Sequence, residues 1–175
     1  MMAERGDVRG AADLLEQALV EDPQDEASLV ALCGFADKLP KGFGLSDKLS
    51  RALAGLPPPA ADAASRRQRA ALWQRLGELA RKRDPAGAIE AFEQVVALDP
   101  DQQAAREALA SLYKDRGGYE DAALENHRKL LAFDVTRADS LRALAAGFAR
   151  RGMVDQARCC HEVLSVLGLA TKDEE

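Results

Sequence analysis

The chain has 175 residues, a net charge of -5 and a hydrophobic fraction of 47%, and only 5% of its residues are aromatic. A fold of this length buries about 70% of the surface of its unfolded chain, and the abundant Leu, Val and Ala exclude wholesale disorder. The mild acidity gives no general attraction to nucleic acid. The longest apolar stretches are far shorter than the roughly 20 residues that a transmembrane helix needs.

No basic and apolar leader precedes the first helical pattern, so we expect a protein that is not exported. Three cysteines, Cys33, Cys159 and Cys160, are too few for a disulfide framework and indicate a reducing compartment. The sequence therefore predicts a cytoplasmic protein without membrane insertion. The excess of Arg over Lys and the abundant Ala are typical of a bacterium with a GC-rich genome.

Apolar residues at i, i+4 and i+7 recur along the chain, a spacing that places them on one face of a helix. The first such set is Ala11, Leu15 and Ala18, and Pro23 closes it. The pattern returns in 45–57, 88–100, 123–135 and 157–169. The closing positions 23, 57, 100, 135 and 169 are separated by 34, 43, 35 and 34 residues, which indicates an internal repeat.

A second helical pattern, with the spacing i, i+3, i+4 and i+7, precedes each of these helices except the first. It begins at Leu29, Trp73, Arg106 and Leu141, and the version at Arg106 is weaker at its first slot. The third slot holds a small residue in every copy: Cys33, Gly77, Ala110 and Ala145. A small residue lets the paired helix approach closely, so the sequence predicts a chain of helix pairs.

These motifs resemble the tetratricopeptide repeat. The residues that carry the resemblance best are Trp73, Leu76, Gly77, Ala88, Phe92 and Pro100. Ala80 stands where the family usually has a tyrosine, and the turn between the two helices is one residue shorter than the family norm. The resemblance covers nearly the whole chain, and it is weaker before Pro57. It implies an all-α fold, in which antiparallel helix pairs stack into a right-handed superhelical solenoid with a concave groove.

The repeats divide the chain into four segments. Residues 1–57 hold a half-repeat and one divergent repeat, 58–69 form a Pro/Ala-rich and then Arg-rich connection, 70–170 hold three repeats, and 171–175 form an acidic tail. Prolines exclude a continuous helix at the start of the connection, and a kinked connection within one superhelix is favoured over a flexible hinge. Because solenoid ends need caps, the opening half-repeat indicates either a fragment of a longer array or a first helix covered by something else.

Each predicted pair has a first and a second helix in chain order, and one face of the first helix lies beside the contact between the two. The resemblance implies that this face lines the concave groove and contacts extended peptides or partner helices. The predicted groove residues are Gln74, Glu78, Arg81, Glu107, Ser111, Lys114 and Arg142. They mix both charge signs, and they lack the asparagines of repeats that clamp a terminal carboxylate. We therefore predict a non-catalytic scaffold that binds a peptide or helix of a partner protein.

The outer face of the last helix is apolar throughout, whereas the earlier helices carry polar residues, such as Asp47 and Glu90, at the first two of its three positions. Cys159, Val163 and Val166 form this stripe, and Ala170 lies beyond them. An apolar stripe in place of a solvated face favours burial against a partner or a second subunit. The alternative is that residues 167–171 fold back and partly shield it. With the unpaired first helix, the stripe supports a second hypothesis, a self-associating structural module that forms a homo-oligomer.

Seven basic residues gather between positions 66 and 83, and Glu78 is the only opposing charge among them. They could steer an acidic peptide or contact nucleic acid. No aromatic side chain is available among them to stack on bases, because Trp73 belongs to the helix seam. A solvated helix face is therefore favoured, and a nucleic-acid partner is not expected.

Residues with catalytic or metal-binding potential are few. His127 and His161 are 34 residues apart, so they occupy one slot in successive repeats, about 10 Å from each other and too far apart to share a zinc ion. Inert packing is favoured over redox chemistry for Cys159 and Cys160. The sequence contains no glycine-rich phosphate loop, GxSxG elbow or HExxH motif. We therefore expect no catalytic residue, metal or cofactor. A third functional hypothesis, after the peptide-binding scaffold and the self-associating module, is an accessory domain broken from a larger enzyme.

Overall fold

The computed structural model describes residues 8–22, 25–35, 38–39, 44–114 and 116–171. These residues form nine α-helices and no strand: α1 (Val8–Glu21), α2 (Glu26–Gly34), α3 (Leu45–Gly55), α4 (Ala63–Ala80), α5 (Pro85–Leu98), α6 (Gln103–Lys114), α7 (Glu120–Phe133), α8 (Ala138–Arg150) and α9 (Val154–Val166). Every helix lies where the repeats predict one, so the all-α class is confirmed. Pro23 and residues 172–175 of the predicted acidic tail lie outside the described residues.

The helices belong to two compact units, Met1–Pro100 with α1–α5 and Asp101–Glu175 with α6–α9. The division between the units follows α5 and does not coincide with the proline-rich connection. The Arg-rich half of that connection is helical, because α4 begins at Ala63. Asp62 caps this helix, since its carboxylate accepts a hydrogen bond from the Ser65 backbone N–H at 2.8 Å.

Leucine side chains from α2, α3 and α4 dominate the core of the first unit. The buried cluster consists of Ala12, Leu29, Leu32, Leu45, Leu49, Leu53, Leu72, Leu76 and Ala91. Helix α1 packs against α2, and both α2 and α3 pack against α4. Helices α2 and α3 approach each other less closely than the helices of the later pairs do, even though Cys33 supplies the small residue predicted to bring them together.

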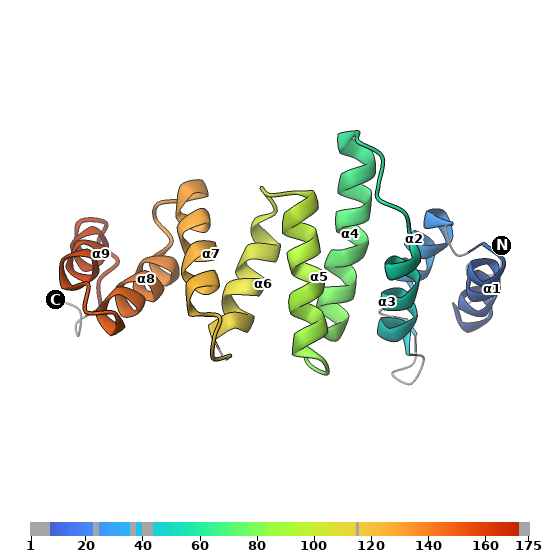
Figure 1. Ribbon diagram of the computed structural model, residues 1–175, viewed down its shortest axis with the longest axis horizontal. Helices are drawn as coiled ribbons and strands as arrows, with labels where there is room; N and C mark the ends of the chain where they lie inside the picture. The colour runs from blue at the N-terminus through green and yellow to red at the C-terminus, as the bar shows by residue number, and fades with distance from the viewer. Residues whose placement is uncertain (1–7, 23–24, 36–37, 40–43, 115, 172–175) are drawn as a thin grey trace. The chain divides into compact units, whose positions relative to one another are not determined.

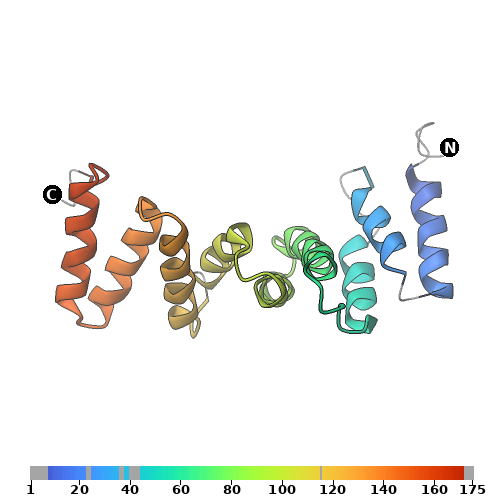
Figure 2. The ribbon, with the colours of Figure 1, turned by 90° about the horizontal axis from the view of Figure 1, so that it is seen from above.

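Helices α4 and α5 form a closely packed pair and lie side by side in both views (Figures 1 and 2). Gly77 on α4 meets the ring of Phe92 on α5, because a Cβ atom at position 77 would lie 2.8 Å from the ring Cζ atom. Phe92 is 1% exposed, so the ring fills the space that the glycine leaves open. The close approach predicted from the small residue at position 77 is confirmed for this pair.

One arginine of the basic cluster is buried. Arg69, on α4, is only 4% exposed. Its Nε donates a hydrogen bond to Glu26 Oε1 at the start of α2 at 3.1 Å, and its Nη1 donates to the Pro57 carbonyl oxygen at 3.0 Å. The prediction of a solvated basic face is therefore wrong for Arg69. This side chain ties the proline connection and α2 to α4.

The second unit consists of the pairs α6/α7 and α8/α9, with α7 packed against α8. Its apolar core is formed by Ala105, Ala108, Leu109, Ala110, Tyr113, Leu124, Leu130, Leu141, Leu144, Ala145, Ala157 and Leu164. Arg106 occupies the slot that Trp73 fills in the preceding repeat, and it is 8% exposed. Its Nη1 donates to Asn126 Oδ1 on α7 at 3.4 Å. A buried polar pair thus replaces the apolar contact at the slot where the repeat pattern is weakest.

Candidate functional site

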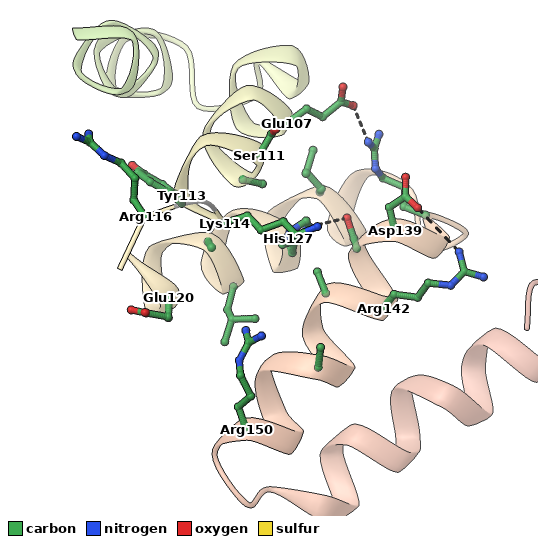
Figure 3. A pocket seen from close by; sticks show the side chains of 18 of the residues that line it. Glu107, Ser111, Tyr113, Lys114, Arg116, Glu120, His127, Asp139, Arg142 and Arg150 are labelled. Carbon is green, nitrogen blue, oxygen red and sulfur yellow. Dashed lines mark hydrogen bonds and ion pairs between the residues drawn. The ribbon is translucent and has the colours of Figure 1, made fainter. Parts of the chain in front are cut away.

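A groove of about 1000 Å³ lies in the second unit between α6 and α8, with residues of α7 between the two walls (Figure 3). Its lining comprises Glu107, Ala110, Ser111, Tyr113, Lys114, Arg116, Gly117, Glu120, Ala123, Leu124, His127, Leu130, Arg137, Asp139, Ser140, Arg142, Ala143, Ala146 and Arg150. The walls are the first helices of two successive pairs. This is the arrangement that the resemblance implies for a concave groove.

Four predicted groove residues line this space together. Glu107, Ser111 and Lys114 lie at helical spacing on α6, and Arg142 belongs to α8 on the other wall (Figure 3). Ala146 follows Arg142 by one helical turn on the same wall, and it is exposed. The lining therefore combines charged, hydroxyl and small apolar side chains.

The other three predicted residues belong to the first unit. Gln74 Nε2 donates to Glu78 Oε1 at 3.0 Å, and Arg75 Nη1 binds Glu78 Oε2 at 3.2 Å. Arg81 is exposed at the C-terminal end of α4. None of the three lines the groove of the second unit, and a role for them in partner binding stays a prediction.

Two ion pairs stand at one end of the groove. Arg137 Nη2 lies 2.7 Å from Glu107 Oε1 and so connects the start of α8 to α6. Arg142 Nη1 lies 3.9 Å from Asp139 Oδ1, and Arg142 Nη2 donates to the Leu169 carbonyl oxygen at 2.7 Å. These contacts hold both arginines in defined positions along the wall.

Three further cations belong to the other end. Lys114, Arg116 and Arg150 form no ion pair with any residue that the structure describes. The Arg150 side chain points into the groove, whereas that of Arg116 points away from it (Figure 3). Hydrogen bonds from its own backbone and from Gly118 N–H lower the pKa of Glu120, and the Arg150 charge adds to this effect, so Glu120 is ionised at neutral pH.

His127 lies in the middle of the groove, half-buried on α7. Its Nδ1 lies 3.1 Å from Ser140 Oγ, and Ser140 is 2% exposed. Burial lowers the pKa of His127, and the positive charges of Arg137 and Lys114 lower it further, so the imidazole is neutral at neutral pH. The hydrogen bond joins α7 to α8 at the wall of the groove.

Sequence reasoning missed Arg137 and Arg150 as groove residues. Arg150 lies one position beyond Ala149, where the predicted face of α8 ends, so extending that face by one residue would have found it. Arg137 is the N-terminal cap residue of α8. No helical spacing marks a residue in a turn, and the contact with Glu107 depends on how α6 and α8 are placed.

The predicted apolar stripe on α9 lies at the surface. Val166 is 88% exposed and Val163 is 41% exposed, Cys159 is exposed, and Ala170, beyond the helix, is half-buried. The spacing of the first three residues places them on one side of α9. Whether another molecule covers this side stays a prediction.

The chain turns back toward α8 after α9. Gly168 has a φ of 68°, its N–H donates to the Ser165 carbonyl oxygen at 2.9 Å, and Leu169 N–H donates to the Leu164 carbonyl oxygen at 2.8 Å. These two bonds form a Schellman motif. The Leu169 carbonyl oxygen then binds Arg142 of α8. The alternative in which this segment shields the stripe is therefore wrong for Val166, which stays exposed.

Two of the cysteines have raised pKa values. Burial raises the pKa of Cys33 to about 11, and burial and the neighbouring Cys159 raise the pKa of Cys160. Both thiols are therefore protonated at neutral pH and weakly reactive. In the part of the chain that the structure describes, no three His, Cys, Asp or Glu side chains lie close enough to hold a metal ion. No helix among the described residues has the length and apolar character needed to span a membrane.

A smaller hollow of about 370 Å³ lies in the first unit, lined by residues of α3, α4 and α5. Asp47, Glu90 and Glu93 contribute carboxylates to it, and Trp73 and Leu76 contribute apolar surface. Asp47 and Glu90 are polar positions of the predicted outer faces of α3 and α5. The hollow thus belongs to the outer side of the second helices and contains none of the predicted groove residues.

The chain matches no protein-family model, and no curated protein matches it significantly. Solved structures are similar to it. YrrB, described as a TPR protein with an unusual peptide-binding site, is 17% identical with a TM-score of 0.62 over 95% of this chain and 80% of its own. MamA from AMB-1 is 18% identical with a TM-score of 0.60 over 98% and 89%. PilF of Pseudomonas aeruginosa is 20% identical with a TM-score of 0.54 over 91% and 68%.

Proposed function

We propose that this chain, which has the tetratricopeptide-repeat fold of YrrB and MamA, is a non-catalytic scaffold that binds a segment of a partner protein between α6 and α8. At these low identities the likeness establishes the fold, and the predicted resemblance is confirmed at that level. The peptide-binding site named for YrrB supports a similar use of the groove here. The cytoplasmic location stays a prediction.

The groove between α6 and α8 is the observation that carries this proposal. Its volume of about 1000 Å³ is at the upper end of the roughly 300–1000 Å³ of small-ligand sites, which suits a segment of polypeptide better than a metabolite. The small side chains of Ala143 and Ala146 leave space along the α8 wall. Glu107, Lys114 and Arg142 offer polar contacts to a bound segment.

Filling the groove tests the proposal. In Ala146→Trp, an indole at an exposed position of α8 occupies the space between the walls and leaves the core unchanged. The matched control is Ala132→Trp, which adds the same side chain at an exposed position of α7 outside the groove. Both variants and the parent are used as bait in lysate of the native host, and each captured protein is quantified by mass spectrometry.

We expect at least one protein to be captured by the parent and by Ala132→Trp and to be lost from Ala146→Trp. Circular dichroism of the three baits checks that their helix content is equal. Equal capture by all three folded baits would show that partners bind elsewhere, and the groove proposal would be abandoned.

A second candidate function, self-association, is favoured by apolar side chains exposed on the first and last helices. Val163 and Val166 are exposed on α9, and Leu14 and Val20 of α1 are 57% and 80% exposed. Exposed apolar groups that gather on one face commonly mark an interface. The occupant that this candidate requires is a second copy of the chain.

A further inference from the structure

The charges along the groove specify the chemistry of the segment that it takes. We propose, building on the groove-binding function above, that this segment is acidic and that its carboxylates bind beside Lys114 and Arg150. The proposal names a class of partner, a protein segment rich in Asp or Glu, and it places the acidic side chains at the end of the groove nearest the α6–α7 turn.

Cations outnumber acids in the lining, and the acids are already engaged. Five cationic and three acidic side chains line the groove. Glu107 pairs with Arg137, Asp139 lies beside Arg142, and Glu120 accepts a hydrogen bond from Gly118 N–H. Glu120 keeps its negative charge, so the lining has two more positive than negative charges. Lys114, Arg116 and Arg150 have no ion-pair partner among the described residues, and the excess positive charge lies at their end of the groove.

Lys114 and Arg150 are the two cations that a bound segment would meet. The Lys114 side chain extends toward His127 in the middle of the groove (Figure 3). Arg150 reaches into the same space from the C-terminal end of α8 (Figure 3). The neutral His127 adds no positive charge of its own, so the preference for acids depends on these two side chains.

The surroundings strengthen an ion pair formed there. A segment that fills the groove displaces water from Lys114 and Arg150, and the interaction of unit charges grows as the local dielectric constant falls. Ala143, Ala146 and Leu130 supply apolar contacts between the charged ends. A segment that combines acidic with small or aliphatic side chains therefore matches both parts of the lining.

The net charge of the chain makes this preference easy to distinguish from non-specific attraction. At a net charge of -5 the whole protein attracts basic peptides and repels acidic ones. A preference for an acidic probe must therefore come from a local group of cations. A preference for a basic probe would follow from net charge alone.

The experiment uses three fluorescein-labelled synthetic peptides with the same Ala and Leu positions. Their remaining positions are all Glu, all Gln or all Lys. Binding to the full chain is followed by fluorescence anisotropy at low and physiological salt. The variants are Lys114→Glu, the groove-filling Ala146→Trp, and Lys129→Glu, a matched charge reversal on an exposed lysine of α7 outside the groove.

We expect the Glu peptide to bind tightest, and Lys114→Glu to weaken it by about tenfold and to improve binding of the Lys peptide. Lys129→Glu should leave both affinities within about twofold, and Ala146→Trp should abolish binding of the Glu peptide. Equal or tighter binding of the Gln or Lys peptide to the parent, or no binding of the Glu peptide, overturns the inference.

The proposed function can survive that result. If the Gln or Lys peptide binds the parent best and Ala146→Trp removes that binding, the groove is a peptide site without acidic preference. If partner capture is also unaffected by Ala146→Trp, the groove-binding function itself fails. The two failures are therefore distinguishable.

Discussion

Two buried arginines show how single side chains adapt the repeat. Arg69 is 4% and Arg106 is 8% exposed, and a buried guanidinium is tolerated only when partners satisfy it. Arg69 finds Glu26 and the Pro57 carbonyl oxygen, and Arg106 finds Asn126. At neither position does the local pattern reveal the partner, because the partners of Arg69 lie 43 and 12 residues away and that of Arg106 lies 20 residues away.

Replacing Arg69 by methionine should destabilise the first unit. The variant Arg69→Met keeps most of the side-chain volume and removes the bonds to Glu26 and to Pro57, so we expect a loss of about 2 kcal/mol in the free energy of unfolding. Urea unfolding followed by tryptophan fluorescence measures this loss, because Trp73 is the only tryptophan of the chain and belongs to the first unit.

Arg67→Met serves as the control for that experiment. Arg67 is exposed two residues earlier on α4, and its replacement should change the free energy of unfolding by less than about 0.5 kcal/mol. Equal midpoints for the two variants would show that the bonds of Arg69 do not hold the connection.

At the scale of the helices, the pair α4/α5 shows what a small residue does in the repeat. Gly77 has no side chain, so the Phe92 ring packs directly against its backbone and the two helices approach closely. Cys33 occupies the same slot in the divergent repeat, yet α2 and α3 remain further apart. A small residue at this position therefore permits a close approach of the two helices. The approach occurs only where a side chain of the paired helix fills the space beside the small residue.

Gly77→Ala tests the packing of this pair. The added methyl group would lie 2.8–2.9 Å from three carbon atoms of the buried Phe92 ring, and the ring would have to shift. We expect a net loss of about 1–2 kcal/mol, since the steric cost exceeds the helix propensity gained by alanine. The shift of the urea midpoint, read from Trp73 fluorescence, measures it.

Gly34→Ala makes the same change where there is room. Apart from its chain neighbours and the backbone of its own helix, no described residue comes within 4 Å of a Cβ built at this glycine, which ends α2. Alanine should therefore stabilise the first unit by about 0.5 kcal/mol. If both variants gained stability, the contact between Gly77 and Phe92 would not be a close one.

At the scale of the whole molecule, the first and last helices keep apolar surface in contact with solvent. On α9 the exposed side carries Val163 and Val166. The position of Val163 holds the polar residues Gln17, Arg51, Gln94 and Lys129 in the earlier second helices. Self-association would remove this surface from water.

Val163→Glu should therefore reduce the mass of any oligomer that the chain forms. Burying a carboxylate without a partner is costly, whereas the isolated chain has room for it because Val163 is already exposed. Light scattering coupled to size exclusion measures the mass. Ser165→Glu, at an exposed position of α9 about 200° from Val163, is the matched control.

The hypothesis of self-association makes a definite demand on the parent chain. The parent and Ser165→Glu must have a mass larger than 18.8 kDa, and Val163→Glu must approach that value. A parent that is already monomeric, or three chains of equal mass, would contradict it.

The amino-acid sequence by itself determined the described helices and the close pairs α4/α5, α6/α7 and α8/α9, but not the looser arrangement of α2 and α3. Apolar residues at helical spacing, prolines at the ends of helices and small residues at the close contacts are local signals, and they predicted each described helix. The same spacing placed Glu107, Ser111 and Lys114 on one face of α6, because residues on one face of a helix stay together wherever the helix packs. The resemblance to the tetratricopeptide repeat implied that this face, with Arg142 of α8, lines a groove.

Only the tertiary structure decided which of these faces form a site. It brought Arg137 and Arg150 into the lining of the groove, which does not include Gln74, Glu78 or Arg81, and it buried Arg69 against residues far away in the chain. It also showed that 63–69, the second part of the predicted connection, belong to α4. The physical reason is that helical spacing fixes directions within one helix, whereas burial and ion pairs depend on which helices meet.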